Sequence, residues 1–262
     1  MAYEEIPDPE AIRKAEEDGL FFSEDTTTLL WGKEGIRKAV IPDGVTYIAN
    51  WAFDGCRSLR SVTIPSVVTS IGQEAFAGCE SLRSVTIPSS VMSIKKRAFA
   101  DSGLESVTIL PGVTSIDDQV FWRCSSLQSV TIPSSVTSIG ASAFTGVGSV
   151  VSESVKFPVD QFGVLIDAAG KKLLYAPPSL AGQYSISEGV VEIGREAFDG
   201  CTSLTQVSIP DSVTKIGPYA FYGCTSLTRV TIPDSVTEIA YGAFYGAGCE
   251  EQVKRNYLRL LK

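Results

Sequence analysis

Residues 129–144 read SVTIPSSVTSIGASAF, and similar stretches recur along the chain. Each copy ends in a phenylalanine, and successive phenylalanines lie 22 or 23 residues apart except for one interval of 54. An isoleucine lies five residues before each phenylalanine, and a valine lies three residues before that isoleucine. The phenylalanine column consists of Phe53, Phe76, Phe99, Phe121, Phe144, Phe198, Phe221 and Phe244. Eight copies in register identify a repeat protein.

Within one repeat, apolar and polar residues alternate before the proline. In the second repeat, Val62 and Ile64 face one side of an extended segment, because side chains alternate along a strand. Ser61 and Thr63 face the other side, Pro65 ends the strand, and the later Ala-Phe dipeptide predicts a short helical or 3₁₀ turn. One repeat is too small to fold alone, so stacked repeats must share a core. We therefore predict a right-handed solenoid with one short parallel strand in each turn.

The same stretch, residues 129–144, resembles the BspA-like subclass of leucine-rich repeats. The resemblance covers approximately residues 39–144 and 184–246. It implies an α/β-type leucine-rich-repeat solenoid of eight units of about 23 residues, with no cofactor. It also implies a bacterial protein that is secreted or surface-displayed, since some members are similar to adhesins that bind host matrix proteins or other cells.

The long interval marks an insertion, and the chain is duplicated on a larger scale. Residues 19–31 and 163–175 align without gaps, and each predicts a β-hairpin with two apolar runs around a polar turn. The simpler interpretation makes each hairpin a side flap that re-enters the solenoid, and the alternative makes the flaps a binding rim.

The two ends of the solenoid need caps. Residues 8–18 predict a capping helix with Asp8 as its N-cap. At the other end, Val253, Tyr257, Leu260 and Leu261 form the apolar stripe of a second helix.

The predicted organisation has six segments. They are a capping helix (1–18), a hairpin (19–38), repeats one to five (39–144), an insertion with a hairpin (145–184), repeats six to eight (185–246) and a capping helix (247–262).

Composition excludes several classes of function. The chain of 262 residues carries a formal charge of −8, which disfavours binding to nucleic acid or anionic lipid. It contains no histidine, which excludes Ser-His, Cys-His and His-zinc sites. Asp, Glu, Lys, Tyr, Ser and Cys remain for chemistry, and a carboxylate-based enzyme acting on glycans is the less favoured alternative. There is no long apolar run and no secretory signal, so we expect no membrane insertion. The expected location is the cell surface or the exterior if an export signal was trimmed, and otherwise the cytoplasm.

Five of the six cysteines occupy one column, three residues after the repeat phenylalanine. The column holds Cys56, Cys79, Cys124, Cys201 and Cys224, together with Ser102, Val147 and Ala247. A position that accepts small residues so freely is a packing position, so we predict free buried thiols, with bridges between adjacent turns as the alternative. There is no C-x-x-C spacing, so no metal site is expected. Cys249 lies outside the column and is a candidate reactive thiol.

Two sets of residues are candidate binding sites. The first is a polar ladder on the exposed side of the predicted strands, expected on a concave face, and it comprises Ser61, Thr63, Ser84, Thr86, Ser106, Thr108, Ser129 and Thr131. The alternative is that these residues simply have a high propensity for strands and cover the solvated face of a sheet, with no ligand involved. The second is a tyrosine group on neighbouring turns, Tyr219, Tyr222, Tyr241 and Tyr245, which could instead pack under the last helix or on one another.

The most consistent function is non-catalytic binding of a protein or glycoprotein, with adhesion to a host if the protein is exported. We expect a monomer with a large preformed surface. An intracellular interaction scaffold is the alternative, and free thiols in a reducing compartment would suit it.

Overall fold

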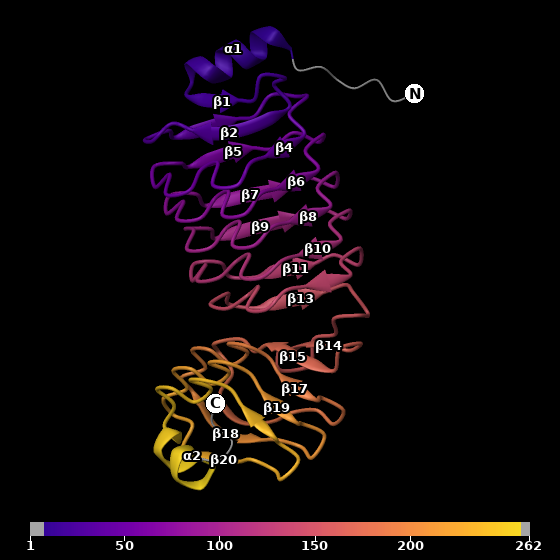
Figure 1. Cartoon of the computed structure of the whole chain (residues 1–262), viewed down its shortest axis with the longest axis vertical. Helices are drawn as coiled ribbons and strands as arrows, with labels where there is room; N and C mark the ends of the chain where they lie inside the picture. The colour runs from indigo at the N-terminus through magenta and orange to yellow at the C-terminus, as the bar shows by residue number, and fades with distance from the viewer. Residues whose placement is uncertain (1–7, 258–262) are drawn as a thin grey trace. The chain divides into compact units, whose positions relative to one another are not determined.

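The computed structural model describes the backbone of residues 8–257 and the side chains of residues 8–254. The chain divides into two compact units, the first ending at Val147 and the second beginning at Gly148 (Figure 1). Each unit is built from solenoid turns of the predicted period, and the predicted solenoid class is confirmed.

Each turn of the first unit contains two short strands, where the sequence predicted one. The longer strands precede the repeat proline and are β3 (Lys38–Val40), β5 (Ser61–Thr63), β7 (Ser84–Ile87), β9 (Ser106–Ile109) and β11 (Val130–Ile132). The shorter strands are β4 (Tyr47–Ile48), β6 (Ser70–Ile71), β8 (Ser93–Ile94), β10 (Ser115–Ile116) and β12 (Ser138–Ile139), and they pair in parallel in this order. Figure 1 shows the two sets side by side. A two-residue strand carries no detectable alternation, which is why the sequence pattern missed it.

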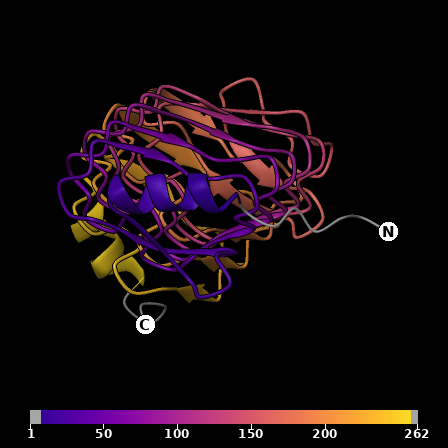
Figure 2. The same ribbon diagram turned by 90° about the horizontal axis from the view of Figure 1, so that it is seen from above.

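The first hairpin is part of the sheet and not a side flap. Strand β1 (Leu20–Phe22) pairs antiparallel with β2 (Thr28–Gly32), and β2 pairs in parallel with β4. The second hairpin strand is therefore the first strand of the seven-stranded sheet. Helix α1 (Pro9–Glu17) lies across this end of the unit (Figure 2). Its N-cap carboxylate, Asp8, accepts a hydrogen bond from the Glu10 N–H, and it buries Ile12 and Ala15.

The second unit repeats this plan. After β13 (Val150–Ser152), the hairpin strands β14 (Leu165–Asp167) and β15 (Lys172–Tyr175) open a five-stranded sheet with β17 (Glu192–Ile193), β19 (Lys215–Ile216) and β21 (Glu238–Ile239). The longer strands β16 (Gly182–Ser185), β18 (Leu204–Ser208) and β20 (Arg229–Thr231) form a second parallel sheet. Here too the hairpin supplies the first strand, because β15 pairs in parallel with β17. Helix α2 (Glu250–Tyr257) follows, while Leu260 and Leu261 lie outside the described residues.

The repeat phenylalanines form a buried stack in each unit. Their ring centroids lie 4.8–6.1 Å apart in successive turns, with planes within 13° of parallel. All six cysteines are free and buried, as predicted for the column. The thiols of Cys79, Cys124 and Cys224 donate to the carbonyl of the phenylalanine in the previous turn, as in the Cys79 Sγ to Phe53 O contact of 3.3 Å. The prediction of a reactive Cys249 is wrong, because that side chain is 2% exposed and burial raises the pKa of its thiol to about 11.

The segment around each phenylalanine is a series of single i→i+3 turns and forms neither a regular α-helix nor a regular 3₁₀-helix. Two residues before the phenylalanine, the backbone is left-handed, with φ of 54° at Glu74 and 57° at Arg97. The same conformation recurs at Trp51, Gln119, Ser142, Glu196, Tyr219 and Gly242. It points alternate N–H groups at the next turn, so that the Phe76 N–H donates to the Ala98 carbonyl at 2.7 Å. A helix would satisfy these groups within its own turn, whereas the solenoid uses them to join turns.

Candidate functional site

The structure places the eight residues of the Ser/Thr ladder on one exposed face of the first unit. The strands register Ser84 with Ser106 and Thr86 with Thr108, while Val85 and Val107 alternate with them toward the core. Ser61 and Thr63 on β5, and Ser129 and Thr131 at β11, are exposed in the same way. The sequence prediction that these side chains share one strand face is therefore confirmed, while their binding role stays a prediction.

The hydroxyl groups of this ladder are available to a ligand. Within the described residues, none of the eight side chains bonds to another group. A second threonine column behaves differently, since the Thr69 and Thr137 hydroxyls donate to the Thr46 and Thr114 carbonyls of the previous turns. Threonine in this fold therefore serves two purposes: one column ties turns together, and the other faces the solvent.

The four tyrosines form one surface cluster in the second unit. Tyr222 and Tyr245 stack with centroids 5.9 Å apart and planes 8° from parallel. Tyr219 makes edge contacts to Tyr222 at 6.0 Å and to Tyr241 at 5.8 Å, and the Arg195 guanidinium lies 5.9 Å from its ring. The side chains of Tyr222, Tyr241 and Tyr245 are 41%, 71% and 58% exposed. The tyrosines thus pack on one another while keeping a large aromatic surface open, and the helix does not bury them.

Sequence reasoning missed an exposed aromatic pair on the first hairpin. Phe21 and Trp31 lie opposite each other on β1 and β2, with stacked rings 5.1 Å apart. They are 38% and 51% exposed. The available signal was their position within the hairpin, because Phe21 lies beside the buried Leu20 and Trp31 beside the half-buried Leu30 in the two apolar runs.

A second missed feature surrounds Trp122. The guanidinium of Arg97 lies 4.9 Å from its ring centre and that of Arg123 lies 4.2 Å away. Arg97 also pairs with Glu74 at 3.9 Å and Asp101 at 3.5 Å. Nearby, burial raises the pKa of the Asp54 carboxyl, the charge of Glu74 raises it further, and Arg97 opposes both. Because the Arg97 guanidinium contacts two carboxylates and the Trp122 ring, this network ties neighbouring turns together.

The described residues offer no metal site and no membrane-spanning segment. In residues 8–257 no three histidine, cysteine or acidic side chains gather into a group that could hold an ion. No helix in that same range has the length and apolarity needed to cross a bilayer.

Comparisons with known proteins agree with this architecture. The model of the BspA type leucine-rich repeat region matches residues 31–157 and 180–255, in six copies. No curated protein matches the chain.

Three solved structures show the same fold. The chain is similar to a leucine-rich cell surface protein from Faecalibacterium prausnitzii A2-165, with 27% identity and a TM-score of 0.65 over 88% of this chain and 84% of that one. It is similar to the pneumococcal vaccine antigen PcpA, with 23% identity and a TM-score of 0.74 over 86% of this chain and 57% of that one. It is also similar to a leucine-rich repeat protein from Eubacterium ventriosum, with 25% identity and a TM-score of 0.58 over 88% and 67% of the two chains.

Proposed function

Because the chain belongs to the family of BspA type leucine-rich repeat proteins, we propose that it is a non-catalytic binding module displayed on a bacterial surface or secreted. Its partner is a protein or glycoprotein of the host. The description of the Faecalibacterium relative as a cell surface protein supports this location.

The observation that carries the proposal is the tyrosine cluster. Exposed aromatic rings that are already held by their neighbours lose little side-chain entropy when a partner binds. Tyr222 and Tyr245 are fixed in this way by their mutual stacking. Tyrosine is also among the residues that dominate the binding energy of protein interfaces. The cluster is therefore the proposed centre of the contact.

The Ser/Thr ladder is a second proposed contact surface. Its free hydroxyls can both donate and accept, which suits polar peptide groups or sugar hydroxyls. No charge lies among the eight ladder residues themselves, so this surface would act by many weak contacts in register.

Solid-phase binding of the purified chain tests the proposal. The immobilised panel contains human extracellular-matrix glycoproteins, mucin and free glycans. We expect saturable binding to at least one member and a loss of affinity of about tenfold or more in the double variant Tyr222→Ala/Tyr245→Ala. Circular dichroism and a melting curve show whether that variant keeps its fold.

A matched control comes from the other unit. Phe21→Ala/Trp31→Ala removes a second exposed stacked pair and should leave the affinity unchanged. A third variant, Ser84→Lys/Ser106→Lys/Ser129→Lys, tests the ladder. Full binding by the folded tyrosine variant would remove the cluster from the proposal. Loss of binding in the hairpin variant or in the ladder variant would then show which of those surfaces makes the contact. If the wild type binds nothing in the panel, the adhesive function is wrong, and an intracellular scaffold becomes the function to test by pull-down.

A further inference from the structure

Arginine precedes the longer strand in three successive turns at the start of the first unit. The residues are Arg37, Arg60 and Arg83, and the Arg60 N–H donates to the Arg37 carbonyl at 2.8 Å, which fixes their register. The equivalent position in later turns of the two units holds Glu105, Gln128, Thr205 and Thr228. A position that accepts glutamate, glutamine and threonine does not need arginine for folding, so the three cations require another explanation.

Two of these guanidinium groups have no carboxylate beside them. Arg83 Nε lies 3.4 Å from the Glu105 carboxylate, whereas Arg37 and Arg60 make no ion pair with any side chain that the structure describes. Both side chains are exposed, and neighbouring strands lie only about 4.8 Å apart. Like charges on neighbouring strands destabilise a sheet. An anion bound between the two arginines relieves this repulsion.

A pocket of about 410 Å³ lies beside Arg37, between helix α1 and the segment that contains β3. Lys14 and Asp18 line it from the helix, and Arg37 and Lys38 line it from the facing segment, over the buried Ala15 and Ile36. Lys14 and Lys38 are exposed, and neither makes an ion pair within residues 8–254. Three cations therefore face one carboxylate, and the pocket keeps a surplus of positive charge.

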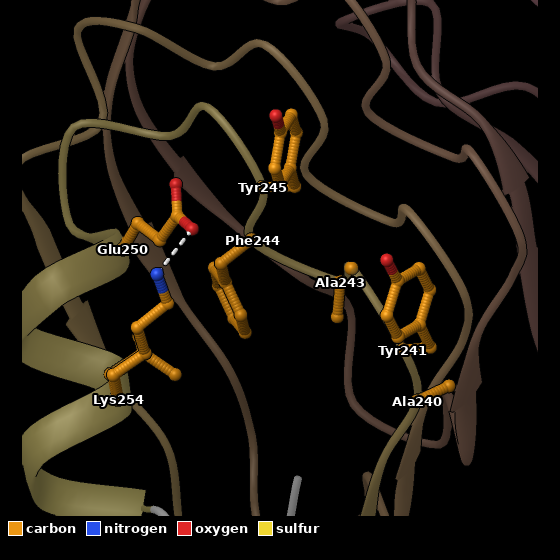
Figure 3. A pocket seen from close by; sticks show the side chains of 9 residues that line it. Ala240, Tyr241, Ala243, Phe244, Tyr245, Glu250 and Lys254 are labelled. Atoms are coloured by element: carbon orange, nitrogen blue, oxygen red, sulfur yellow. Dashed lines mark ion pairs between the residues drawn. The ribbon is translucent and has the colours of Figure 1, made fainter. Parts of the chain in front are cut away.

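The second unit has a pocket of similar size in which the charge is balanced. It has a volume of about 350 Å³ and lies between the last turn and helix α2 (Figure 3). Lys254, the cation among its described lining residues, lies 2.8 Å from the Glu250 carboxylate and 3.2 Å from that of Glu251. The carboxylates there neutralise the cation, whereas the cations beside Arg37 remain available to an anion.

The cations of the first unit continue directly into the Ser/Thr ladder. Lys38 pairs with Ser61 in the parallel register of β3 and β5, and Val40 pairs with Thr63. A ligand that reaches from the pocket onto this face therefore meets cations first and hydroxyl groups next. An acidic polysaccharide matches both, because its anionic groups bind guanidinium and ammonium ions while its hydroxyls exchange hydrogen bonds with serine and threonine.

We propose that this face of the first unit binds a sulfated polysaccharide. One sulfate lies in the pocket against Lys14, Arg37 and Lys38, the next lies against Arg60, and the sugar chain continues onto the ladder from Ser61. Cations on successive turns require negative charges at short intervals, and sulfated sugars carry more of these than sugars with uronic acids alone. The inference rests on the proposed function, since it names the chemistry of the glycan that a host glycoprotein would present.

The acidic character of the whole chain limits what can bind at this place. The chain carries −8, and Glu10, Glu16 and Glu17 of α1 lie outside the pocket lining. A stiff ligand with charge along its whole length, such as a nucleic acid duplex, is repelled by these surroundings. An acidic peptide fits less well, because it offers the ladder no row of hydroxyl groups.

Fluorescence anisotropy of a labelled heparin oligosaccharide, titrated with the full chain, tests the proposal. We expect saturable binding that weakens as the salt concentration rises, because the cations displace counterions from the sugar. The variant Arg37→Gln/Lys38→Gln/Arg60→Gln should lose about tenfold or more in affinity. Melting curves show whether this variant and the others keep their fold.

A matched control removes three cations elsewhere. Lys96→Gln/Lys171→Gln/Arg229→Gln changes the net charge by the same amount, at exposed positions outside the pocket lining. It should bind heparin as the wild type does, since exposed charges farther away than about 8 Å are largely screened at physiological ionic strength.

A second pair of variants tests whether the sugar chain reaches the ladder. Ser61→Glu places a carboxylate in register with Lys38 and should weaken heparin binding. Ser129→Glu makes the same change at the same position three turns away, about 14 Å along the sheet, and should weaken it less. Equal weakening by the two variants would show that binding follows net charge and not this site, and would overturn the inference.

The remaining outcomes separate this inference from the proposed function. Unchanged heparin binding by the triple variant would refute the inference, and so would equal affinity for poly-glutamate, a nucleic acid duplex or hyaluronan, which has no sulfate. Matrix binding by a wild type that does not bind heparin would refute this inference alone. Loss of matrix binding by Tyr222→Ala/Tyr245→Ala, with unchanged heparin affinity, would support a separate polysaccharide site, because both tyrosines belong to the second unit.

Discussion

The ring of Phe76 lies 5.1 Å from that of Phe99, with the two planes only 3° from parallel, and both side chains are fully buried. Each ring fills the space between two neighbouring turns. The phenylalanine stack is therefore the part of the core that joins one turn to the next.

Shortening Phe99 to alanine should cost the first unit about 3–5 kcal/mol of unfolding free energy, because the stack cannot collapse around the cavity. Urea unfolding followed by circular dichroism measures this loss. Phe21→Ala is the control, since that ring is 38% exposed and its removal should cost less than about 1 kcal/mol. Equal losses for the two variants would show that the stack does not hold the turns together.

Gly78→Ala should destabilise the first unit by about 1 kcal/mol, because the backbone at this position is left-handed with φ of +65°. A methyl group finds room there, with its nearest neighbour at 3.6 Å. Asp101 and Arg123 occupy the equivalent position in other turns, so the fold should survive. Thermal melting measures the effect.

Gly103→Ala provides the contrast, since its methyl group would collide with the Glu80 carbonyl oxygen and the Arg83 side chain. It should destabilise the unit more than Gly78→Ala does. If Gly78→Ala is the more destabilising of the two, backbone strain and not contact between turns determines the cost of replacing these glycines.

The six thiols should be unreactive toward Ellman's reagent at pH 8 in the folded protein and should all react in urea. Burial raises the pKa of Cys124 to about 11 and that of Cys201 to about 12, so the reactive thiolate is scarce. Absorbance at 412 nm counts the thiols. One thiol per chain that reacts rapidly in the folded wild type, and is missing in the Cys249→Ser variant, would contradict the buried position of Cys249.

The second unit should lose stability as the pH rises above about 10, the ordinary pKa of a tyrosine side chain. Burial is the main cause that raises the pKa values of Tyr175 and Tyr184. Since their neutral forms are favoured in the folded state, the stabilisation is complete below their unfolded pKa and is lost progressively above it. Urea unfolding from pH 8 to 11 should therefore show a falling midpoint.

The variant Tyr175→Phe/Tyr184→Phe should make that fall shallower. It should also cost stability at pH 7, because the Tyr184 hydroxyl donates to Asp160 at 2.9 Å. Tyr241→Phe, on an exposed ring, serves as the control and should follow the wild type. An unchanged pH profile in the double variant would assign the alkaline loss to other groups, such as the buried thiols.

Most of the repeating core could be predicted from the sequence. The valine, isoleucine and phenylalanine columns are buried as their spacing indicated, except for the half-buried Ile139, and the cysteines of the cysteine column are free thiols. The exposed Ser61 and Thr63 followed from alternation alone. These features depend on a pattern that each turn repeats, so a local signal was enough.

The features that do not repeat needed the tertiary structure. The sequence revealed both hairpins, but only the pairing of β2 with β4 shows that a hairpin forms the end of a sheet. Likewise, it grouped Tyr222 with Tyr245, yet their stacking and exposure depend on neighbouring turns.

The sequence by itself determined the length of a turn, its inward-facing residues and its exposed hydroxyls. Only the tertiary structure decided how each series of turns begins and how the last turn meets helix α2. The physical reason is that a turn is stabilised by copies of itself, which the period encodes. An end is stabilised by single contacts between different elements, such as the Gly246 N–H with the Glu250 carboxylate, and no period in the sequence encodes such a contact.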